Sequence, residues 1–128
     1  MGTGTSIGRV RGLGSAKQGT VHWWRQRLTA GSNFALVSWL LISLARMGGY
    51  DYASVHAWLR SGWVAVPMAL LVISVFYHFR LGLQTVIEDY QHDESRIVML
   101  VLRNVWTYGL GAVAIFSILK VAFTGAAA

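Results

Sequence analysis

This chain contains no cysteine, a single proline and little charge. Its 128 residues include eleven lysines and arginines but only five aspartates and glutamates. The absence of cysteine excludes disulfides, thiolate zinc sites and protein-ligated iron–sulfur clusters within the chain. Charged residues make up 12% of the sequence, where soluble domains have about 25%. A soluble domain of this size would lack the polar residues to cover its surface, so the composition favours a membrane protein.

The net charge of +6 is unevenly distributed along the chain. Five of the eleven basic residues precede residue 28, and no acidic residue does. Basic residues that flank an apolar segment orient it with that side in the cytoplasm. The positive charge is therefore interpreted as a membrane-orientation signal, and no nucleic-acid partner is expected.

Three long apolar segments follow, at residues 28–49, 64–87 and 97–119. Each is close to the roughly 20 residues that a helix needs to cross a hydrocarbon core of about 30 Å. The strands of a membrane barrel alternate in polarity, and these segments do not, so helices are the expected spanning elements. We therefore predict an all-α membrane protein with an N-terminal tail at residues 1–27 and a three-helix transmembrane anchor domain at residues 28–128.

Lysine and arginine also set the expected orientation. The N-terminal tail and the connection at residues 88–96 together carry six of the basic residues, which places both in the cytoplasm and the C-terminus in the periplasm. The connection at residues 50–63 is expected to be a short link outside. Pro67 is expected in the first turn of the second helix, where a missing N–H costs little. We interpret the chain as a multi-pass protein of a bacterial inner membrane, in preference to a mitochondrial one.

The second apolar segment contains an ionisable residue, His78, far from both of its ends. At about 100° per residue, four small or polar residues fall on the same helix face, within about 40° of it: Ser74, Gly82, Thr85 and Asp89. An ionisable residue inside a membrane is costly and is a functional candidate for that reason. Two interpretations remain open. His78 is either a neutral imidazole that bonds across a helix interface or an axial ligand to haem, beside which Gly82 leaves room.

The other histidines, His22, His56 and His92, lie outside the three segments. A haem with two histidine ligands would therefore take its second ligand from another chain. Asp89 and Tyr90 follow the apolar run at the expected cytoplasmic interface. They are either an interfacial tyrosine beside a helix-terminal acid or part of a quinone site, where a phenol donates to a carbonyl and a carboxylate orients it.

Together these residues resemble the small hydrophobic membrane-anchor subunit of succinate dehydrogenase, of the alphaproteobacterial type. The motif His78-x-Arg80-x-Gly82 is followed by Asp89-Tyr90 eleven and twelve residues after the histidine. HWWRQRLTA, residues 22–30, adds a histidine and an Arg-x-Thr-Ala before the first span. GRVRGLGSAKQGT, residues 8–20, is similar to the N-terminal tail of that branch. The resemblance covers nearly the whole chain.

The resemblance implies a role for five residues. His78 matches the axial ligand to the iron of haem b. Tyr90 matches the tyrosine that hydrogen-bonds the ubiquinone carbonyl, and Asp89 matches the acid beside it. Arg27 and His22 match residues near the haem propionates and the quinone pocket. Arg80 and Arg103 are interpreted as structural, either snorkelling to the interface or bonding a neighbouring helix.

The resemblance also implies partner subunits. These are a second membrane anchor of the cytochrome b type that shares the haem, an iron–sulfur subunit, and a flavoprotein subunit that carries FAD. Electrons from succinate oxidation would pass through the iron–sulfur clusters to ubiquinone, which links the tricarboxylic acid cycle to the respiratory chain. Two alternatives remain: a fumarate reductase anchor that works in reverse with menaquinone, and a cofactor-free three-helix interaction protein.

Overall fold

The computed structural model describes residues 19–91 and 93–124 of the chain. They form four helices: α2 spans Gly19–Ala45, α3 spans Tyr52–Arg60, α4 spans Gly62–Tyr90 and α5 spans Ser95–Phe123. This described part contains no strand, so the predicted all-α fold is confirmed. The greater part of the predicted N-terminal tail, residues 1–18, and His92 lie outside the described residues.

Three of the helices are long and apolar enough to cross a membrane. α2, α4 and α5 contain 27, 29 and 29 residues. At 1.5 Å per residue, helices of this length measure about 40 Å and exceed a hydrocarbon core of about 30 Å. α4 and α5 extend beyond their apolar segments at both ends, whereas α2 begins nine residues before its segment and ends at Ala45, four residues before the predicted end at residue 49. Because α4 begins at Gly62, Pro67 lies in its second turn and not in its first.

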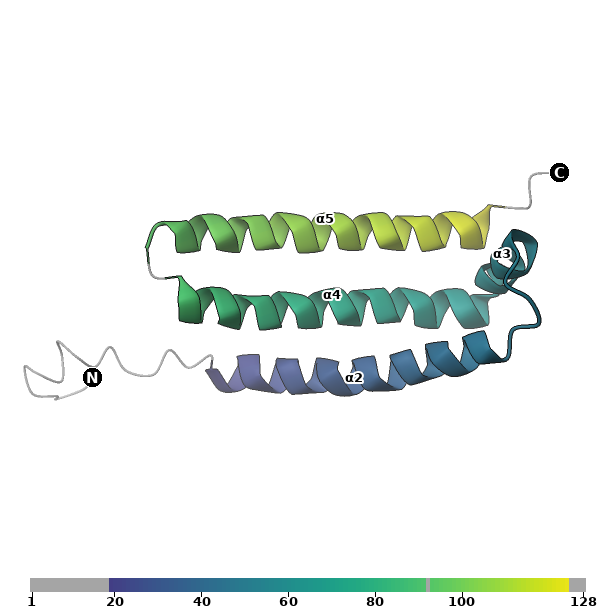
Figure 1. The fold of residues 1–128 in the computed structure, drawn as a ribbon, viewed down its shortest axis with the longest axis horizontal. Coiled ribbons are helices and arrows are strands. Elements are labelled where there is room, and N and C mark those ends of the chain that lie inside the picture. The colour runs from purple at the N-terminus through teal and green to yellow at the C-terminus, as the bar shows by residue number, and fades with distance from the viewer. Residues whose placement is uncertain (1–18, 92, 125–128) are drawn as a thin grey trace, which may run out of the picture.

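α4 is the central helix of the bundle. Figure 1 shows α2 on one side of it and α5 on the other, with neighbouring helices antiparallel and α3 across one end. The buried apolar residues of the described chain all belong to α4: Val64, Ala65, Leu71, Leu81 and Ile87. α2 has no buried residue. Large apolar side chains cover the outer faces of the long helices, a surface suited to lipid or to further helices.

The sequence did not predict α3, which occupies most of the connection expected at residues 50–63. Asp51 caps its N-terminus, accepting from the Ser54 hydroxyl at 2.6 Å and from the Ser54 N–H at 3.2 Å. Both hydrogen bonds lower the pKa of the Asp51 carboxyl from its ordinary value, and the bond from the Ser54 hydroxyl has the larger effect. Trp58 Nε1 donates to Ser43 Oγ at 3.0 Å and so joins α3 to the end of α2.

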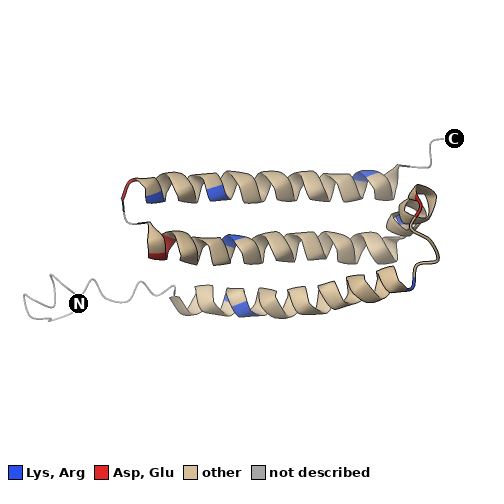
Figure 2. Ribbon diagram, in the orientation of Figure 1, with Lys and Arg blue, Asp and Glu red and all other residues tan. Residues whose placement is uncertain are grey.

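Charged residues gather toward one end of the bundle. Figure 2 shows acidic residues where α4 ends and in the connection to α5, with basic residues nearby on all three long helices. Arg96 lies 3.9 Å from Glu88 across this connection. Such a distribution is expected of helices that place their polar end at one membrane surface.

Asn104 joins two arginines between α4 and α5. Arg80 Nε donates to Asn104 Oδ1 at 3.0 Å, and Arg103 Nη2 donates to the same oxygen at 2.8 Å. Arg103 Nη1 also donates to Gln84 Oε1 at 3.1 Å, and the Gln84 amide donates to Glu88 at 2.9 Å. Arg103 is only 6% exposed. A buried guanidinium needs acceptors, and Arg103 finds one on its own helix, Asn104, and one on α4, Gln84, while its Nε has no partner. Each arginine thus bonds a residue of the neighbouring helix, which is one of the two structural roles expected for them.

We predict that Asn104→Leu loosens the packing of α4 on α5. The two guanidiniums would lose their shared acceptor, which costs about 1–2 kcal/mol. The measurement is the thermal unfolding midpoint of the protein purified from membranes in mild detergent, where a lower midpoint is expected. Ser117→Ala is the matched control, since it removes an exposed polar side chain from the same helix. Equal midpoints for the two variants would contradict the prediction.

Candidate functional site

His78 points from α4 toward α2. Its Nδ1 lies 3.0 Å from the hydroxyl oxygen of Thr29, and its Nε2 lies 3.5 Å from the side-chain nitrogen of Gln26. The imidazole is partly buried. It therefore lies in the interface between two helices, and both ring nitrogens face polar groups of α2.

The bonds of Thr29 assign a tautomer to His78. Thr29 Oγ1 lies within donor distance of two carbonyl oxygens of its own helix, Arg25 at 2.8 Å and Gln26 at 3.1 Å. A hydroxyl has one hydrogen, and we assign it to the Arg25 carbonyl, the nearest of its three partners. With this assignment Thr29 Oγ1 accepts from His78 Nδ1–H. The neutral imidazole therefore keeps a lone pair on Nε2, toward which the Gln26 amide nitrogen is directed as a weak donor.

Further polar residues extend this contact into a polar seam along α2 and α4. The seam consists of His22, Gln26, Thr29 and Asn33 of α2 with Ser74, His78 and Gly82 of α4. The α2 members are spaced by four, three and four residues, which places them on one helix face. The backbone of α2 approaches only α4 among the described helices, so this face is directed at α4.

Most buried polar atoms that lack a hydrogen-bond partner lie in the polar seam. In the described part of the chain there are five such side-chain atoms, and the seam contains four of them: His22 Nε2, Gln26 Oε1, Asn33 Oδ1 and Ser74 Oγ. Each unsatisfied buried group costs about 1–3 kcal/mol. Native proteins leave such groups where a water, an ion or a ligand completes them. The seam is thus the part of the chain best prepared to receive another molecule.

Gly82 keeps the space next to His78 narrow but free of side chain. A Cβ at this position would lie 3.4 Å from the Gln26 side-chain nitrogen. A larger residue would press on the flexible Gln26 amide. That Gly82 leaves room for a haem beside His78 stays a prediction.

The donor set of the seam fits one face of a haem. Haem iron requires only axial ligands from the protein, and a neutral imidazole with a lone pair on Nε2 is one. Across the described residues, no three histidine, aspartate or glutamate side chains gather around a common point, so a metal held by this chain's side chains alone has no site there. The Gln26 side chain would turn away from Nε2 to admit the iron.

The other predicted site residues occupy three different surroundings. His22 lies in the polar seam, one turn before Gln26. Arg27 is exposed, and its guanidinium carbon lies 4.0 Å from the ring centre of Trp23, so its charge is directed away from the seam. Asp89 and Tyr90 form the exposed end of α4, where Tyr90 is 79% exposed.

The structure therefore brings His22 to the same interface as His78 and leaves Asp89 and Tyr90 at a separate position. Twelve residues separate Tyr90 from His78, about 18 Å along a helix. Since α2 and α4 are antiparallel, the start of α2 lies at the same end of the bundle as Tyr90 (Figure 1).

Sequence reasoning missed the two α2 residues in contact with His78. Thr29 belonged to the quoted Arg-x-Thr-Ala motif, but it had no role there, and Gln26 was not considered. The signal was present in the spacing of His22, Gln26, Thr29 and Asn33, which places them on one face of the helix. Their contact with His78 follows from the register between two helices, which the spacing alone does not give.

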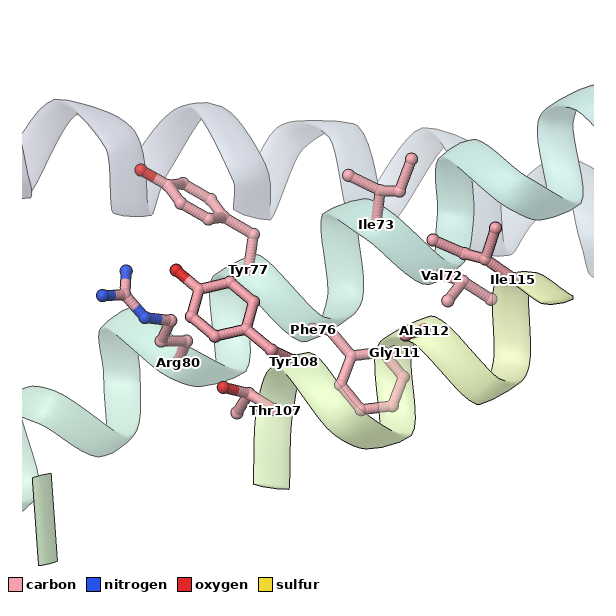
Figure 3. A pocket seen from close by; sticks show the side chains of 10 residues that line it. All are labelled: Val72, Ile73, Phe76, Tyr77, Arg80, Thr107, Tyr108, Gly111, Ala112 and Ile115. Atoms are coloured by element: carbon pink, nitrogen blue, oxygen red, sulfur yellow. The ribbon is translucent and has the colours of Figure 1, made fainter. Parts of the chain in front are cut away.

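A groove lies between α4 and α5, away from the polar seam. Figure 3 shows Arg80 at one end of this groove, toward which the hydroxyl groups of Tyr77 and Tyr108 are directed. The Arg80 guanidinium carbon lies 5.3 Å from the ring centre of Tyr108. The cavity is about 300 Å³ and is otherwise lined mainly by apolar side chains such as Phe76 and Ile115. It contains none of the predicted site residues.

Comparison with known proteins identifies relatives over most of the chain. The sequence model of the succinate dehydrogenase/fumarate reductase transmembrane subunit family matches residues 1–123. The succinate dehydrogenase hydrophobic membrane anchor subunit of Paracoccus denitrificans is 27% identical over 111 residues, covering 87% of this chain and 86% of the relative. The subunit of the same name from Rickettsia bellii is 36% identical over 84 residues, covering 66% of this chain and 67% of the relative.

A succinate dehydrogenase membrane anchor subunit of Reclinomonas americana is 32% identical over 93 residues, covering 70% of this chain and 78% of the relative. No solved structure matches the chain. The family match covers almost the entire sequence. The three membrane-length helices of the chain agree with a transmembrane subunit. The chain therefore belongs to the family of succinate dehydrogenase/fumarate reductase transmembrane subunits, as a succinate dehydrogenase membrane anchor.

Proposed function

We propose that this chain holds one side of a haem b and one side of a ubiquinone site in a succinate:ubiquinone oxidoreductase. The observation that carries the proposal is the polar seam, where the lone pair of His78 Nε2 lies among buried polar atoms without partners. Membership of the family supports it independently.

The haem side of the proposal rests on His78 and its neighbours in the seam. His78 Nε2 would hold the haem iron, and the Gln26 side chain, which would lie 3.4 Å from a Cβ at Gly82, would have to turn aside to admit the porphyrin. His22, in the first turn of α2, is a candidate for contact with the propionates. Arg27 is a candidate only if its guanidinium leaves the Trp23 ring and turns toward the seam. The second histidine ligand would come from the other membrane anchor. When bound, the haem supplies a one-electron store beside the quinone site.

The quinone side rests on Asp89 and Tyr90 at the end of α4. A ubiquinone headgroup at this depth keeps its tail in lipid. The Tyr90 O–H donates to one quinone carbonyl oxygen, and this hydrogen bond strengthens as negative charge develops on that oxygen. The Asp89 carboxylate orients the phenol and passes protons from the aqueous side. Both side chains are exposed on this chain, so neighbouring subunits complete the pocket.

The proposed partners follow from the exposed ends and faces of the helices. A second membrane anchor, of the cytochrome b type, packs on the apolar faces, and the iron–sulfur and flavoprotein subunits lie at the end of the bundle where α4 terminates. That end is cytoplasmic in the proposed orientation, in a bacterial inner membrane. Electrons from succinate then reach ubiquinone at Tyr90 without crossing the membrane.

His78→Ala is expected to remove haem from the purified complex, because no other described imidazole lies in the polar seam within reach of the same position. Haem is measured by reduced-minus-oxidised absorbance, relative to the amount of flavoprotein subunit. His56→Ala, which removes a histidine from α3 at the far end of α4, is the matched control and should retain full haem. Wild-type haem in the His78 variant would overturn the ligand assignment.

Tyr90→Phe is expected to slow ubiquinone reduction about ten- to a hundredfold, because a hydrogen bond to a developing charge contributes about 1.5–3 kcal/mol. Succinate oxidation with a soluble dye should remain at the wild-type rate, since the flavin lies on another subunit. Tyr52→Phe, at the opposite end of the bundle, is the control. Equal loss of both activities in the Tyr90 variant would indicate a misfolded subunit and count against the quinone role.

The orientation is testable because the chain has no cysteine of its own. Ala53→Cys and Glu94→Cys each place one exposed thiol on this chain, at opposite ends of the bundle. A membrane-impermeant maleimide added to intact spheroplasts should label the thiol at position 53, whereas labelling at position 94 should require permeabilised membranes. The reverse pattern would invert the proposed topology.

A further inference from the structure

We propose that Thr29 is a positioning residue for the haem ligand: its hydroxyl fixes the tautomer and the ring orientation of His78 and increases the donor strength of Nε2. This inference rests on the proposed role of His78 as an axial ligand. It concerns a residue of α2 that carries no cofactor contact itself and acts only through the 3.0 Å bond to His78 Nδ1.

Thr29 is held rigidly enough to act as a fixed acceptor. Its hydroxyl bonds back to the carbonyls of Arg25 and Gln26, at 2.8 and 3.1 Å, which directs the hydroxyl hydrogen along α2. Its branched side chain also restricts rotation about χ1 in a helix. The acceptor lone pair therefore keeps one position relative to α4, and it does so with groups of this chain alone.

A fixed acceptor at Nδ1 has two consequences for the imidazole. First, the hydrogen bond holds the proton on Nδ1, so Nε2 keeps a lone pair that meets only the weak Gln26 donor at 3.5 Å. Second, it fixes the rotation of the ring, so that Nε2 is directed at the Gln26 amide and the space beside Gly82. Without Thr29, the ring could turn or exchange tautomers, and Gln26 would provide the only described polar contact.

The same bond affects the strength of the ligand. A histidine that donates its second ring N–H to an acceptor becomes a more basic ligand, and losing that acceptor typically weakens metal binding ten- to a hundredfold. A more basic ligand stabilises ferric over ferrous iron. Removing the Thr29 hydroxyl should therefore shift the haem midpoint potential to a more positive value and weaken retention of the haem.

Hydroxyl groups that bond back to their own helix are not rare in α2, and this provides the matched control. Ser32 Oγ donates to the Leu28 carbonyl at 3.0 Å in the same way, but it has no contact with His78. Any effect of removing a helix hydroxyl as such would appear at Ser32 as well. An effect confined to Thr29 would instead follow from its bond to the histidine.

The test compares Thr29→Val, Thr29→Ser and Ser32→Ala in the intact detergent-purified complex. Thr29→Val keeps the shape of the side chain and removes only the hydroxyl, whereas Thr29→Ser keeps the acceptor. The readouts are haem per complex after a dilution series, the haem midpoint potential, and the low-spin electron paramagnetic resonance signal of the ferric haem. The Val variant should retain haem about ten- to a hundredfold less tightly and show a more positive potential and an altered signal. The Ser and Ser32 variants should match the wild type.

His78→Ala, measured in parallel, separates this inference from the proposed function. If that variant keeps its haem, the ligand assignment fails and the role of Thr29 fails with it. If it loses haem while Thr29→Val has the wild-type potential, signal and retention, the ligand assignment stands and Thr29 is not a positioning residue. A Ser variant that behaves like the Val variant would also overturn the inference, because the hydroxyl would then not be the cause.

Discussion

A bilayer offers no water to polar groups, and this constraint governs the whole chain. Every backbone N–H and C=O inside the hydrocarbon core must bond within the protein, which the long helices achieve by their own geometry. The few polar side chains in those helices have no such internal solution. They must find partners on a neighbouring helix or receive them from another molecule. Because α4 lies between α2 and α5, polar side chains such as His78 and Arg80 meet one of two interfaces, whereas Thr85 and Asp89 are exposed. The two interfaces meet this requirement differently.

The interface of α4 with α5 is largely satisfied by the chain itself. Asn104 accepts from both arginines, and Gln84 connects Arg103 to Glu88, so amide oxygens of the two helices accept from both guanidiniums and only Arg103 Nε is a buried atom without a partner. The polar seam between α2 and α4 is different, since it leaves four buried side-chain atoms without partners. If these positions served only to pack two helices, apolar residues would be favoured there, because burying an apolar side chain leaves no hydrogen-bonding group unsatisfied. The contrast supports the proposal that the seam between α2 and α4 is completed by another molecule, although both interfaces pack the bundle.

Hydropathy predicted the three long helices because their apolar runs are longer than a buried strand or a loop. The helical periodicity of the second run predicted the polar stripe around His78. Hydropathy locates the part of a helix that lies in the bilayer, and not the residues at which its backbone hydrogen bonding begins and ends. It therefore placed the start of the first helix at residue 28, although α2 begins at Gly19. α3 was missed because nine amphipathic residues resemble a loop in a sequence dominated by longer apolar runs. The contact of Thr29 with His78 depends on the register of two antiparallel helices, which a single sequence does not specify. Tyr90 is exposed at the end of α4, so no contact within the described part of the chain marks it as a site.

The two candidate positions on α4 differ in how much of their environment this chain supplies. Both lie on one continuous helix, so their separation of about 18 Å is fixed by the helical rise and is independent of how α2 packs. At His78, α2 supplies the groups that contact the imidazole. At Tyr90, 79% of the residue is exposed, so the proposed quinone pocket needs residues from other subunits. The register of α2 on α4 therefore affects the histidine without moving the tyrosine. If both proposed roles hold, the ligand strength at one position and the quinone pocket at the other change independently on a single helix.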